Sequence, residues 1–252
     1  MKLIVTHEAT DFDAFAAAVA AQRLHPGAVI GLGRHLARPV RDFLALHKDR
    51  FPFVRCTSIE SAAVDTLIVV DVRSRRRLAH ASAVLDRLDE IEQLYVYDHH
   101  PAADDDLIGH VDVVEPVGAV TTLLVERLRR VGGDIDVIEA TLFALGIYTD
   151  TAALTLGNTS PRDARAVAWL LEQGARLPMI NRYLYPPLDD AQRRALGQVL
   201  GDHEVVTVGG LRVGFGLLRT TRHVEGLAVV TTEACKLENL AALFTVCAVG
   251  GR

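Results

Sequence analysis

The run Thr66-Leu67-Ile68-Val69-Val70 is β-branched and almost wholly apolar, and it ends at Asp71. A strand of this composition is typical of a parallel sheet that is covered by helices on both faces. Similar short runs over 3–5, 28–32 and 93–97 alternate with amphipathic stretches of helix length. The alternation continues through about the first 175 residues and predicts the βαβ units of an α/β protein.

Helices are expected over 13–23, 39–47, 74–88, 118–131, 136–149, 160–174 and 178–185. The pair Pro186-Pro187 is the clearest break in this pattern, so we place a domain boundary there. Domain 1–187 then holds the parallel sheet, and 188–252 forms a small α+β second domain. That domain is expected to contain a linking helix, a hairpin around Gly209-Gly210, a further helix and a last strand near 242–249. It is expected to be incomplete, because it would end on an edge strand.

The chain has 252 residues, half of them apolar, which is enough to bury a full core. Its formal net charge of -5 gives no overall attraction to nucleic acid or to an anionic membrane. No apolar run has the length of a signal segment or of a membrane span. Cys56, Cys235 and Cys247 are scattered and are expected to be free thiols. The composition therefore favours a cytoplasmic globular protein with no membrane partner.

Acidic and imidazole side chains stand where separate apolar runs end. His7, Asp71 and Asp98 each follow one of the expected strands, and His99 and His100 behind Asp98 have no packing explanation. Because parallel strands deliver their carboxyl ends to one edge of a sheet, we expect these side chains to share one crevice. Clustered carboxylates repel one another unless a cation holds them, which favours a hydrolytic centre with two divalent metal ions.

The spacing His7-x3-Asp11-x-Asp13 adds further candidate ligands. It would direct two carboxylates to two cations from a loop that enters a helix. The alternative is that Asp11 is a helix N-cap and Asp13 a first-turn acid favoured by the helix dipole. Asp71 alone would also fit a helix cap. Mixed carboxylate and imidazole ligands suit manganese or magnesium.

Four motifs together resemble those of the DHH phosphoesterase family. They stand in the family's order: His7-Glu8-Ala9-Thr10-Asp11-Phe12-Asp13-Ala14, Val69-Val70-Asp71, Asp98-His99-His100 and Leu145-Gly146-Ile147-Tyr148-Thr149-Asp150-Thr151. Shorter matches at 73–75, 118–124 and 160–166 are similar to the branch found ahead of CBS domains and a tRNA nucleotidyltransferase or poly(A) polymerase-like module. The resemblance implies a parallel-sheet DHH domain followed by a DHH-associated substrate-binding domain.

The resemblance also implies roles for individual residues. Two manganese ions, or magnesium in their place, would be held by His7, Asp11 and Asp71, and by Asp13, Asp71, His99 and Asp150. Asp71 would bridge the two ions. Asp98 would orient His99, and His100 would face the scissile phosphate.

Substrate contacts are expected around this centre. Gly118 and Thr121 begin a helix whose free backbone donors would hold a phosphate oxygen, although ordinary capping explains them as well. Arg34 and Arg73 belong to two basic clusters that follow strand ends, and a solvated face is the alternative for the cluster of Arg73. Ala152 stands where the family often has glycine, which puts the fit of the substrate in question.

The leading hypothesis is a manganese-dependent phosphodiesterase or phosphatase that hydrolyses short nucleotides or RNA ends with water activated by two metals. Inorganic pyrophosphatase or exopolyphosphatase-like activity is an alternative, but the similar pyrophosphatases carry a Ser-Arg-Lys signature that does not occur here. A third hypothesis is a weakly active, metal-stabilised regulatory domain of an RNA-processing protein. The substrate would be a nucleotide or short RNA, and the sequence is compatible with a homodimer.

Overall fold

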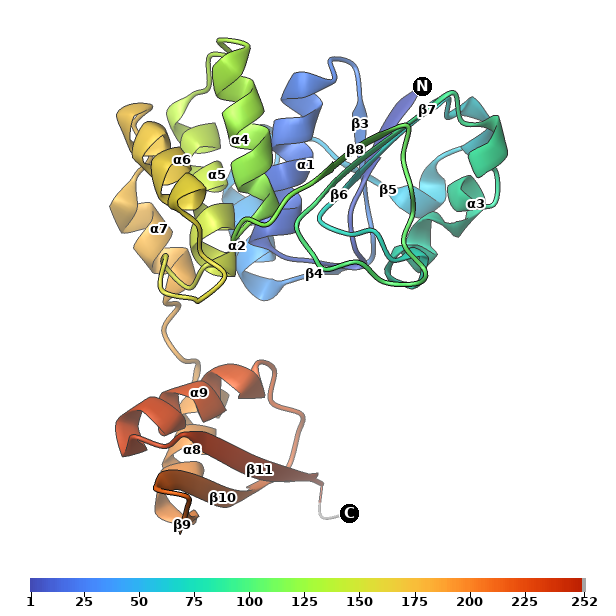
Figure 1. Ribbon diagram of the computed structural model, residues 1–252. Coiled ribbons are helices and arrows are strands. Elements are labelled where there is room, and N and C mark those ends of the chain that lie inside the picture. The colour runs from blue at the N-terminus through green and yellow to red at the C-terminus, as the bar shows by residue number, and fades with distance from the viewer. Residues whose placement is uncertain (251–252) are drawn as a thin grey trace. The chain divides into compact units, whose positions relative to one another are not determined.

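The computed structural model describes residues 1–250 (Figure 1). The chain divides into two compact units, Met1–Pro186 and Pro187–Arg252, and each is described by itself. All three cysteines are free thiols, as expected. Within the described residues, no helix has both the length and the apolar character to cross a membrane.

The first unit is built on a six-stranded parallel sheet with the order β5-β3-β1-β6-β7-β8. Its strands are β1 (Lys2–Val5), β3 (Val29–Leu32), β5 (Val54–Arg55), β6 (Thr66–Val70), β7 (Gln93–Asp98) and β8 (Val111–Val114). Chain order runs outward from β1 through β3 and β5 on one side, and from β6 through β7 and β8 on the other. The order therefore reverses between β1 and β6. Ligand sites of open α/β sheets form beyond the carboxyl ends of the strands at such a point.

Helices cover both faces of this sheet, so the predicted α/β class is confirmed (Figure 1). Successive strand residues point to opposite faces, and Ile4 and Ile68 pack into one core while Leu3 and Leu67 pack into the other. The larger core lies under α1 (Phe12–Leu24), α2 (Arg38–His47), α4 (Val120–Arg130), α5 (Val137–Asp150), α6 (Pro161–Glu172) and α7 (Leu177–Leu184). The smaller core lies beside α3 (Ser82–Leu85) and the 3-10 helices η1 (Cys56–Ser58), η2 (Ser61–Ala63), η3 (Arg75–Ala81) and η4 (Leu88–Glu90).

Helices α1 and α5 approach each other closely because both carry small residues at their contact. A Cβ atom added to Gly146 of α5 would lie 2.9 Å from the Cβ of Ala16 in α1 and 2.7 Å from the Oγ1 of Thr121 in α4. No larger residue fits at Gly146 unless a neighbour moves. This packing brings Asp150, the last residue of α5, beside Asp13 in the first turn of α1.

The expected single helix over 74–88 is wrong. The segment begins with η3, in which Leu78 has non-helical φ and ψ angles of -107° and 24°, and α3 adds only one α-helical turn. Part of the backbone is bonded outside the segment, because the carbonyl of Arg77 accepts a hydrogen bond from the N–H of Glu8. The amphipathic pattern alone gave no sign of this external partner.

Four short strands were not predicted either. β5 and β8 lie at the two edges of the large sheet, and β2 (Ala9–Thr10) forms a separate parallel pair with β4 (His35–Leu36). Each of the four spans only two to four residues. A periodic arrangement of apolar residues cannot be recognised over so short a length.

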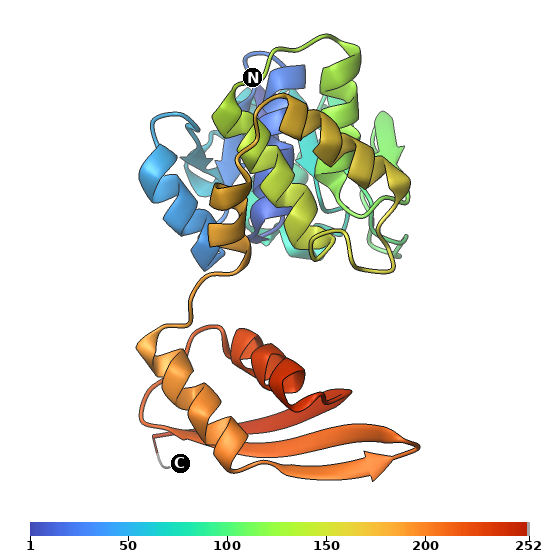
Figure 2. The same cartoon turned by 90° about the vertical axis from the view of Figure 1, so that its left-hand side faces the viewer.

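The second unit packs two helices on one face of a three-stranded sheet (Figure 2). Its elements are α8 (Asp190–Gly201), β9 (Glu204–Val208), β10 (Leu211–Thr220), α9 (Leu227–Glu238) and β11 (Ala242–Val249). β9 and β10 form the predicted hairpin. Gly209 and Gly210 have φ angles of 57° and 84°, the left-handed conformations that a two-residue type I′ turn needs. β11 pairs with β10 in parallel, so the unit has the small α+β architecture expected here.

We expect Gly146→Ala to lower the free energy of unfolding by about 1–3 kcal/mol, because the added methyl group overpacks the contact of α1 with α5. Gly197→Ala is the matched control, since Gly197 also lies inside a helix but an added Cβ would meet no atom within 4 Å. There the substitution should stabilise its unit by about 0.5–1 kcal/mol. Urea unfolding followed by circular dichroism measures both effects. Equal effects at the two positions would contradict the packing argument.

Candidate metal centre

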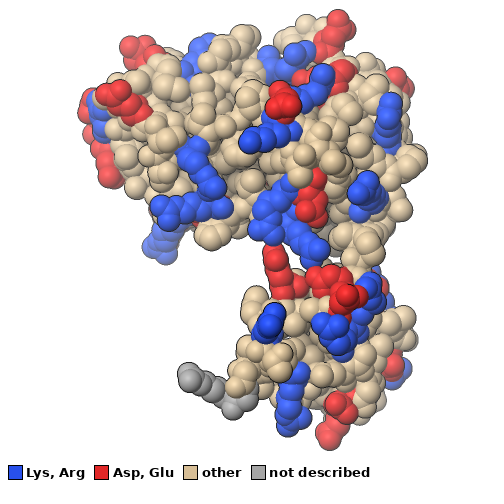
Figure 3. Space-filling model, turned by 180° about the vertical axis from the view of Figure 1, so that it is seen from behind, with Lys and Arg blue, Asp and Glu red and all other residues tan. Residues whose placement is uncertain are grey.

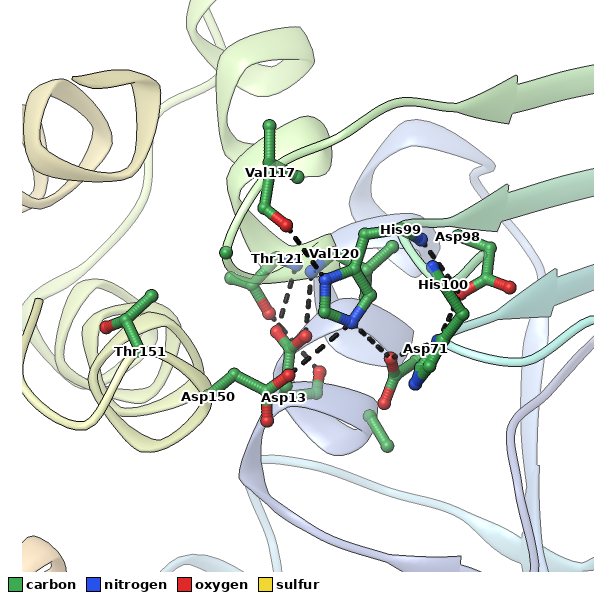
Figure 4. Close-up of polar contacts among 12 residues, drawn as sticks. Asp13, Asp71, Asp98, His99, His100, Val117, Val120, Thr121, Asp150 and Thr151 are labelled. Atoms are coloured by element: carbon green, nitrogen blue, oxygen red, sulfur yellow. Dashed lines mark hydrogen bonds and ion pairs between the residues drawn. The ribbon is translucent and has the colours of Figure 1, made fainter. Parts of the chain in front are cut away.

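Side chains from four separate segments meet at the carboxyl edge of the parallel sheet (Figure 4). They follow β1, β6 and β7 or end α5, at the point where the strand order reverses. Their ligand-type atoms form groups within 4.8 Å of one another. The structure thus brings together all the residues that the sequence nominated as metal ligands: His7, Asp11, Asp13, Asp71, His99 and Asp150.

Asp71 lies between the two expected ligand groups. Its Oδ2 is 3.4 Å from the Nε2 of His7, and its Oδ1 is 3.4 Å from the Nε2 of His99. The residue is 3% exposed and has a left-handed φ of 59°, a conformation that is costly for a residue other than glycine and that recurs at functional sites. Its N–H donates to the carbonyl of Tyr97 on the neighbouring strand. One carboxylate therefore presents one oxygen to each group, as a bridging ligand would.

The geometry of Asp11 is compatible with both roles that the sequence left open. Its Oδ1 accepts a hydrogen bond of 3.1 Å from the N–H of Ala14, so Asp11 is the N-cap of α1. Its Oδ2 lies 3.7 Å from the Nε2 of His7. A carboxylate has two oxygens, so capping a helix leaves the second one available to a cation.

Asp13 is fully buried and interacts with the start of α4 rather than only with its own helix. Its Oδ2 accepts from the N–H of Val120 at 2.7 Å, and its Oδ1 accepts from the N–H of Thr121 at 3.0 Å. The N-terminal end of a helix favours a negative charge at this place. The two hydrogen bonds hold the Asp13 carboxylate beside His99 and Asp150 (Figure 4).

Three of the four carboxylates have raised pKa values. Asp71 is the exception, because burial raises its pKa but its contacts with His7 and His99 outweigh burial and lower that pKa. Burial, with the charges of Asp71 and Asp150, raises the pKa of Asp13 well above its usual range. Burial and the charge of Asp71 also raise the pKa of Asp11, and burial with Asp71 and Asp11 raises the pKa of Asp150 to about 7. Such a group of buried acids holds its protons unless a positive charge replaces them.

His99 is oriented with one ring nitrogen toward the carboxylates. Its Nδ1 lies 3.0 Å from the carbonyl oxygen of Val117, which can only accept, so Nδ1 carries a proton and donates. Its Nε2 lies 3.4 Å from both Asp71 and Asp150. Burial lowers the pKa of His99, but its contacts with Asp71 and Asp13 outweigh burial and raise that pKa to about 10. The raised pKa favours a second proton, on Nε2, and a cation bound at Nε2 would replace that proton.

Two buried atoms of the centre lack hydrogen-bond partners, which bears on whether a metal ion fits there. The Oδ1 of Asp71 and the Nε2 of His99 have no hydrogen-bond partner, although they are 3.4 Å apart. Buried polar atoms are normally satisfied, so two unsatisfied ligand-type atoms that face each other indicate a missing partner between them. Carboxylate oxygen and imidazole nitrogen are suitable donors for a divalent cation. The residues present therefore fit the expected metal ions.

Asp98 contacts the ring of His100 rather than that of His99, which differs from its expected role. Its Oδ1 lies 2.7 Å from the Nδ1 of His100 and accepts from the N–H of His99 at 2.8 Å. The contact with Asp98 raises the pKa of His100, which favours the protonated ring. Asp98 therefore organises the turn that carries both histidines, whereas the Val117 carbonyl orients the His99 ring.

Arg73 positions this turn with its side chain. Its Nε donates to Asp98 at 3.1 Å, its Nη2 donates to the carbonyl of His100 at 2.6 Å, and its Nη1 lies 3.3 Å from Asp106. The side chain is 13% exposed. Each nitrogen is engaged within the protein, which gives Arg73 a positioning role, and its expected contact with a substrate stays a prediction. Arg34 is exposed after β3, and its N–H donates to Glu8.

The expected phosphate contacts at the start of α4 also have internal partners. The N–H of Gly118 donates to Asp163 at 2.9 Å, and both the N–H and the hydroxyl of Thr121 donate to Asp13. Both residues are buried. Gly118 and Thr121 therefore brace the centre, and their expected contact with a phosphate stays a prediction.

Asp163 is the bracing residue whose role the sequence did not reveal. The sequence places it in the matched segment 160–166 and assigns it no further role. In the structure it accepts from the N–H of Ser160. It is also fully buried and accepts from the Thr122 hydroxyl at 2.6 Å as well as from Gly118. It thereby fixes the segment whose Val117 carbonyl holds His99. The motif at 160–166 was the available signal, but the pairing of Asp163 with Thr122, 41 residues earlier, is set by the fold.

A left-handed turn follows Asp150 directly. Ala152, Ala153 and Leu154 have φ angles of 44°, 60° and 67°, although none of them is glycine. The hydroxyl of Thr151 accepts from the N–H of Leu154 at 3.0 Å and helps to hold the turn. Left-handed backbone costs a residue with a side chain roughly 1–2 kcal/mol. The chain therefore stores strain next to the candidate metal centre.

We expect Ala152→Gly to raise the free energy of unfolding by about 1 kcal/mol, because glycine adopts this conformation without steric cost. Ala168→Gly is the matched control, since Ala168 is exposed inside α6 and glycine there should cost about 0.5–1 kcal/mol. Thermal unfolding of the two metal-free variants measures the difference. A loss of stability in both would show that the turn is not strained.

Comparison with known proteins gives two relatives that match the whole chain. They are the A-adding tRNA nucleotidyltransferases of Geobacter sulfurreducens, 31% identical, and of Aquifex aeolicus, 30% identical. The chain spans only 28% and 29% of the lengths of these proteins. No family model matches the chain.

Two solved structures share the fold. An exopolyphosphatase-related protein from Bacteroides fragilis superposes with a TM-score of 0.75 at 18% identity, over 95% of this chain and 73% of that one. A putative family II inorganic pyrophosphatase from Methanococcus jannaschii gives a TM-score of 0.59 at 19% identity, over 99% of this chain and 84% of that one. These likenesses show the fold, and the four motifs that resemble those of the DHH phosphoesterase family are gathered at one edge of its sheet.

Proposed function

We propose that the first unit hydrolyses phosphoester bonds of short nucleotides or RNA ends, with water activated at two manganese ions. The position of Asp71, with one oxygen toward His7 and the other toward His99, is the observation that carries the proposal. A bridging carboxylate is what a two-metal hydrolytic centre requires. The four carboxylates of Asp11, Asp13, Asp71 and Asp150 carry four negative charges when ionised, which two divalent cations would balance.

The proposed ligands fall into two sets around Asp71. His7 and Asp11 would hold one cation with the Oδ2 of Asp71. Asp13, His99 and Asp150 would hold the other with its Oδ1. When bound, the two cations would supply the Lewis acidity that activates a water and polarises a phosphoryl oxygen.

His100 is the side chain best placed to contact a phosphate directly. Its side chain is 41% exposed, whereas that of His99 is 7% exposed. The carboxylate of Asp98 contacts the Nδ1 of His100 and raises the pKa of His100. In the protonated ring, the Nε2 of His100 therefore donates a hydrogen bond toward solvent. This donor would bind a phosphate oxygen or transfer a proton to a leaving group.

Two observations support a nucleotide or an RNA end as the substrate. The relatives that match the whole chain are named as tRNA nucleotidyltransferases, which associates this type of domain with RNA. On the face shown in Figure 3, basic side chains form several separate groups among acidic and neutral ones. A continuous basic surface would be needed to hold a long polyanion against a net charge of -5. A short substrate or a chain end needs only local contacts, for which Arg34 is a candidate.

Activity on pyrophosphate or polyphosphate is the second candidate, because the fold neighbours carry exopolyphosphatase and pyrophosphatase names. A weakly active regulatory domain is the third, because the chain corresponds to less than a third of the length of its curated relatives.

The discriminating experiment compares kcat/KM of the manganese-loaded chain for the dinucleotide pApA, a short RNA, pyrophosphate and tripolyphosphate. The proposal expects the nucleotide substrates to be preferred. Preference for pyrophosphate or tripolyphosphate would contradict it, and absence of turnover on all four would favour the regulatory role.

We expect Asp71→Asn to lower kcat/KM for the best of these substrates by more than about 100-fold, since even residues that only support metal ligands typically contribute 10–100-fold. Asp49→Asn, at an exposed position outside the centre, should leave activity within about two-fold. Circular dichroism spectra should be the same for both variants. Turnover at the wild-type level by Asp71→Asn in saturating manganese would remove Asp71 from the proposed mechanism.

A further inference from the structure

The three-stranded sheet of the second unit has a core on only one of its faces (Figure 2). Leu218 of β10 and Leu243 of β11 pack with α8 and α9, where the small core lies. In the first unit, by contrast, separate cores cover both faces of the large sheet. Because successive strand residues point to opposite faces, the neighbours of Leu218 and Leu243 lie on the face away from the two helices, which we call the outer face.

The outer face is apolar and exposed. Phe215 and Phe244 stand side by side on β10 and β11, and their stacked rings have centroids 5.4 Å apart. They are 47% and 61% exposed. Exposed apolar side chains extend from this pair across all three strands: Val206, Val208, Phe215, Leu217, Phe244 and Val246. A contiguous apolar surface of this kind is typical of an interface with another protein.

The outer face also carries two opposite charges, Glu204 on β9 and Arg219 on β10. Glu204 lies beside Phe215 in the ladder, and Arg219 lies four residues farther along β10, a distance of about 13 Å at the rise of a strand. Within residues 1–250, neither side chain takes part in an ion pair. Arg212, which leaves the other face of β10, differs because it lies 3.9 Å from Glu238. Both charges of the outer face are thus available to a partner.

The positions of these two charges are complementary to themselves. A second copy of the sheet can be stacked on the outer face with its strands running in the opposite direction. A two-fold axis at the level of Leu217 then relates the two copies and places the level of Phe215 in one opposite the level of Arg219 in the other. Glu204 of each copy comes within reach of Arg219 of the other, so the contact between opposite charges is made twice.

The same stacking also matches large side chains with small ones. Phe244 comes opposite Ala248 of the other copy, because Ala248 stands beside Arg219 in the ladder. Phe215 comes opposite Arg219, whose guanidinium group packs well on an aromatic ring. Leu217 meets its own counterpart at the axis. Stacked sheets interdigitate their side chains in this way in β-sandwiches.

We propose that the outer face of the second unit is the interface of a homodimer, in which two sheets stack face to face with antiparallel strands. Burial of the apolar side chains of β10 and β11 drives the association. The two contacts between Glu204 and Arg219 fix the relative direction of the sheets. This inference concerns assembly, and it does not depend on the activity proposed for the metal centre.

The test follows the oligomeric state of the full chain by analytical ultracentrifugation at a series of concentrations. The wild type should show a monomer–dimer equilibrium. Val246→Glu should raise the dissociation constant by at least about 100-fold, because Val246 lies at the level of the axis and its replacement brings two buried carboxylates together. Leu237→Glu is the matched control, since Leu237 is 64% exposed on α9 and Val246 is 68% exposed. The control should change the dissociation constant by no more than about two-fold, and circular dichroism spectra should be unchanged in both variants.

Charge reversal tests the direction of the stacked sheets. Glu204→Arg and Arg219→Glu should each weaken the dimer by about ten-fold, because each brings like charges together twice. The double variant Glu204→Arg/Arg219→Glu exchanges the two signs, and its dissociation constant should return to within about three-fold of the wild-type value.

Three outcomes would overturn the proposal. A wild type that stays monomeric at every concentration would leave the outer face to a different partner. A dimer that Val246→Glu does not weaken would be formed by another surface, such as the free edge of β11. A double variant weaker than either single variant would exclude the antiparallel arrangement.

Discussion

The carboxylate of Asp71, buried between two imidazoles and close to three further carboxylates, is the feature on which the first unit depends. Buried acids are costly in a folded protein unless protons, hydrogen bonds or cations compensate them. Here burial raises the pKa values of Asp11, Asp13 and Asp150, and two ligand-type atoms at the centre have no hydrogen-bond partner. The left-handed backbone of Asp71 adds strain at the same place. A site of this kind is suited to binding cations. The packing of the surrounding α/β framework offsets the free energy that the buried carboxylates and the strained backbone cost.

The framework holds the centre mainly through backbone groups. The Val117 carbonyl sets the tautomer of His99, and the first N–H groups of α4 hold Asp13. Asp163 fixes the segment that supplies both. The absence of a side chain at Gly146 allows α5 to bring Asp150 to the same point. The convergence of the ligands therefore depends on α4, α5 and α6 as well as on the motifs that follow β1, β6 and β7.

The sequence was sufficient to predict the convergence itself. Parallel strands bring their carboxyl ends to one edge, so His7, Asp71 and Asp98 had to meet once the βαβ pattern was recognised. The bracing contacts were less accessible, because the partners of Gly118, Thr121 and Arg73 are set by the three-dimensional packing of distant segments. A glycine or an arginine near a phosphate-binding motif has the same sequence signature whether it contacts a ligand or the protein. The broken helix after β6 was missed for the same reason, since its bonds to Glu8 lie outside the local pattern.

The central claim is that one carboxylate is shared between two divalent cations. Native mass spectrometry of the metal-free chain, titrated with manganese, tests it most directly when the wild type, Asp13→Asn and Asp71→Asn are compared. The account predicts two ions per wild-type chain, weakened binding of one ion in Asp13→Asn, and weakened binding of both in Asp71→Asn. A single ion in the wild type, or an Asp71→Asn variant that still binds two ions at wild-type affinity, would contradict it.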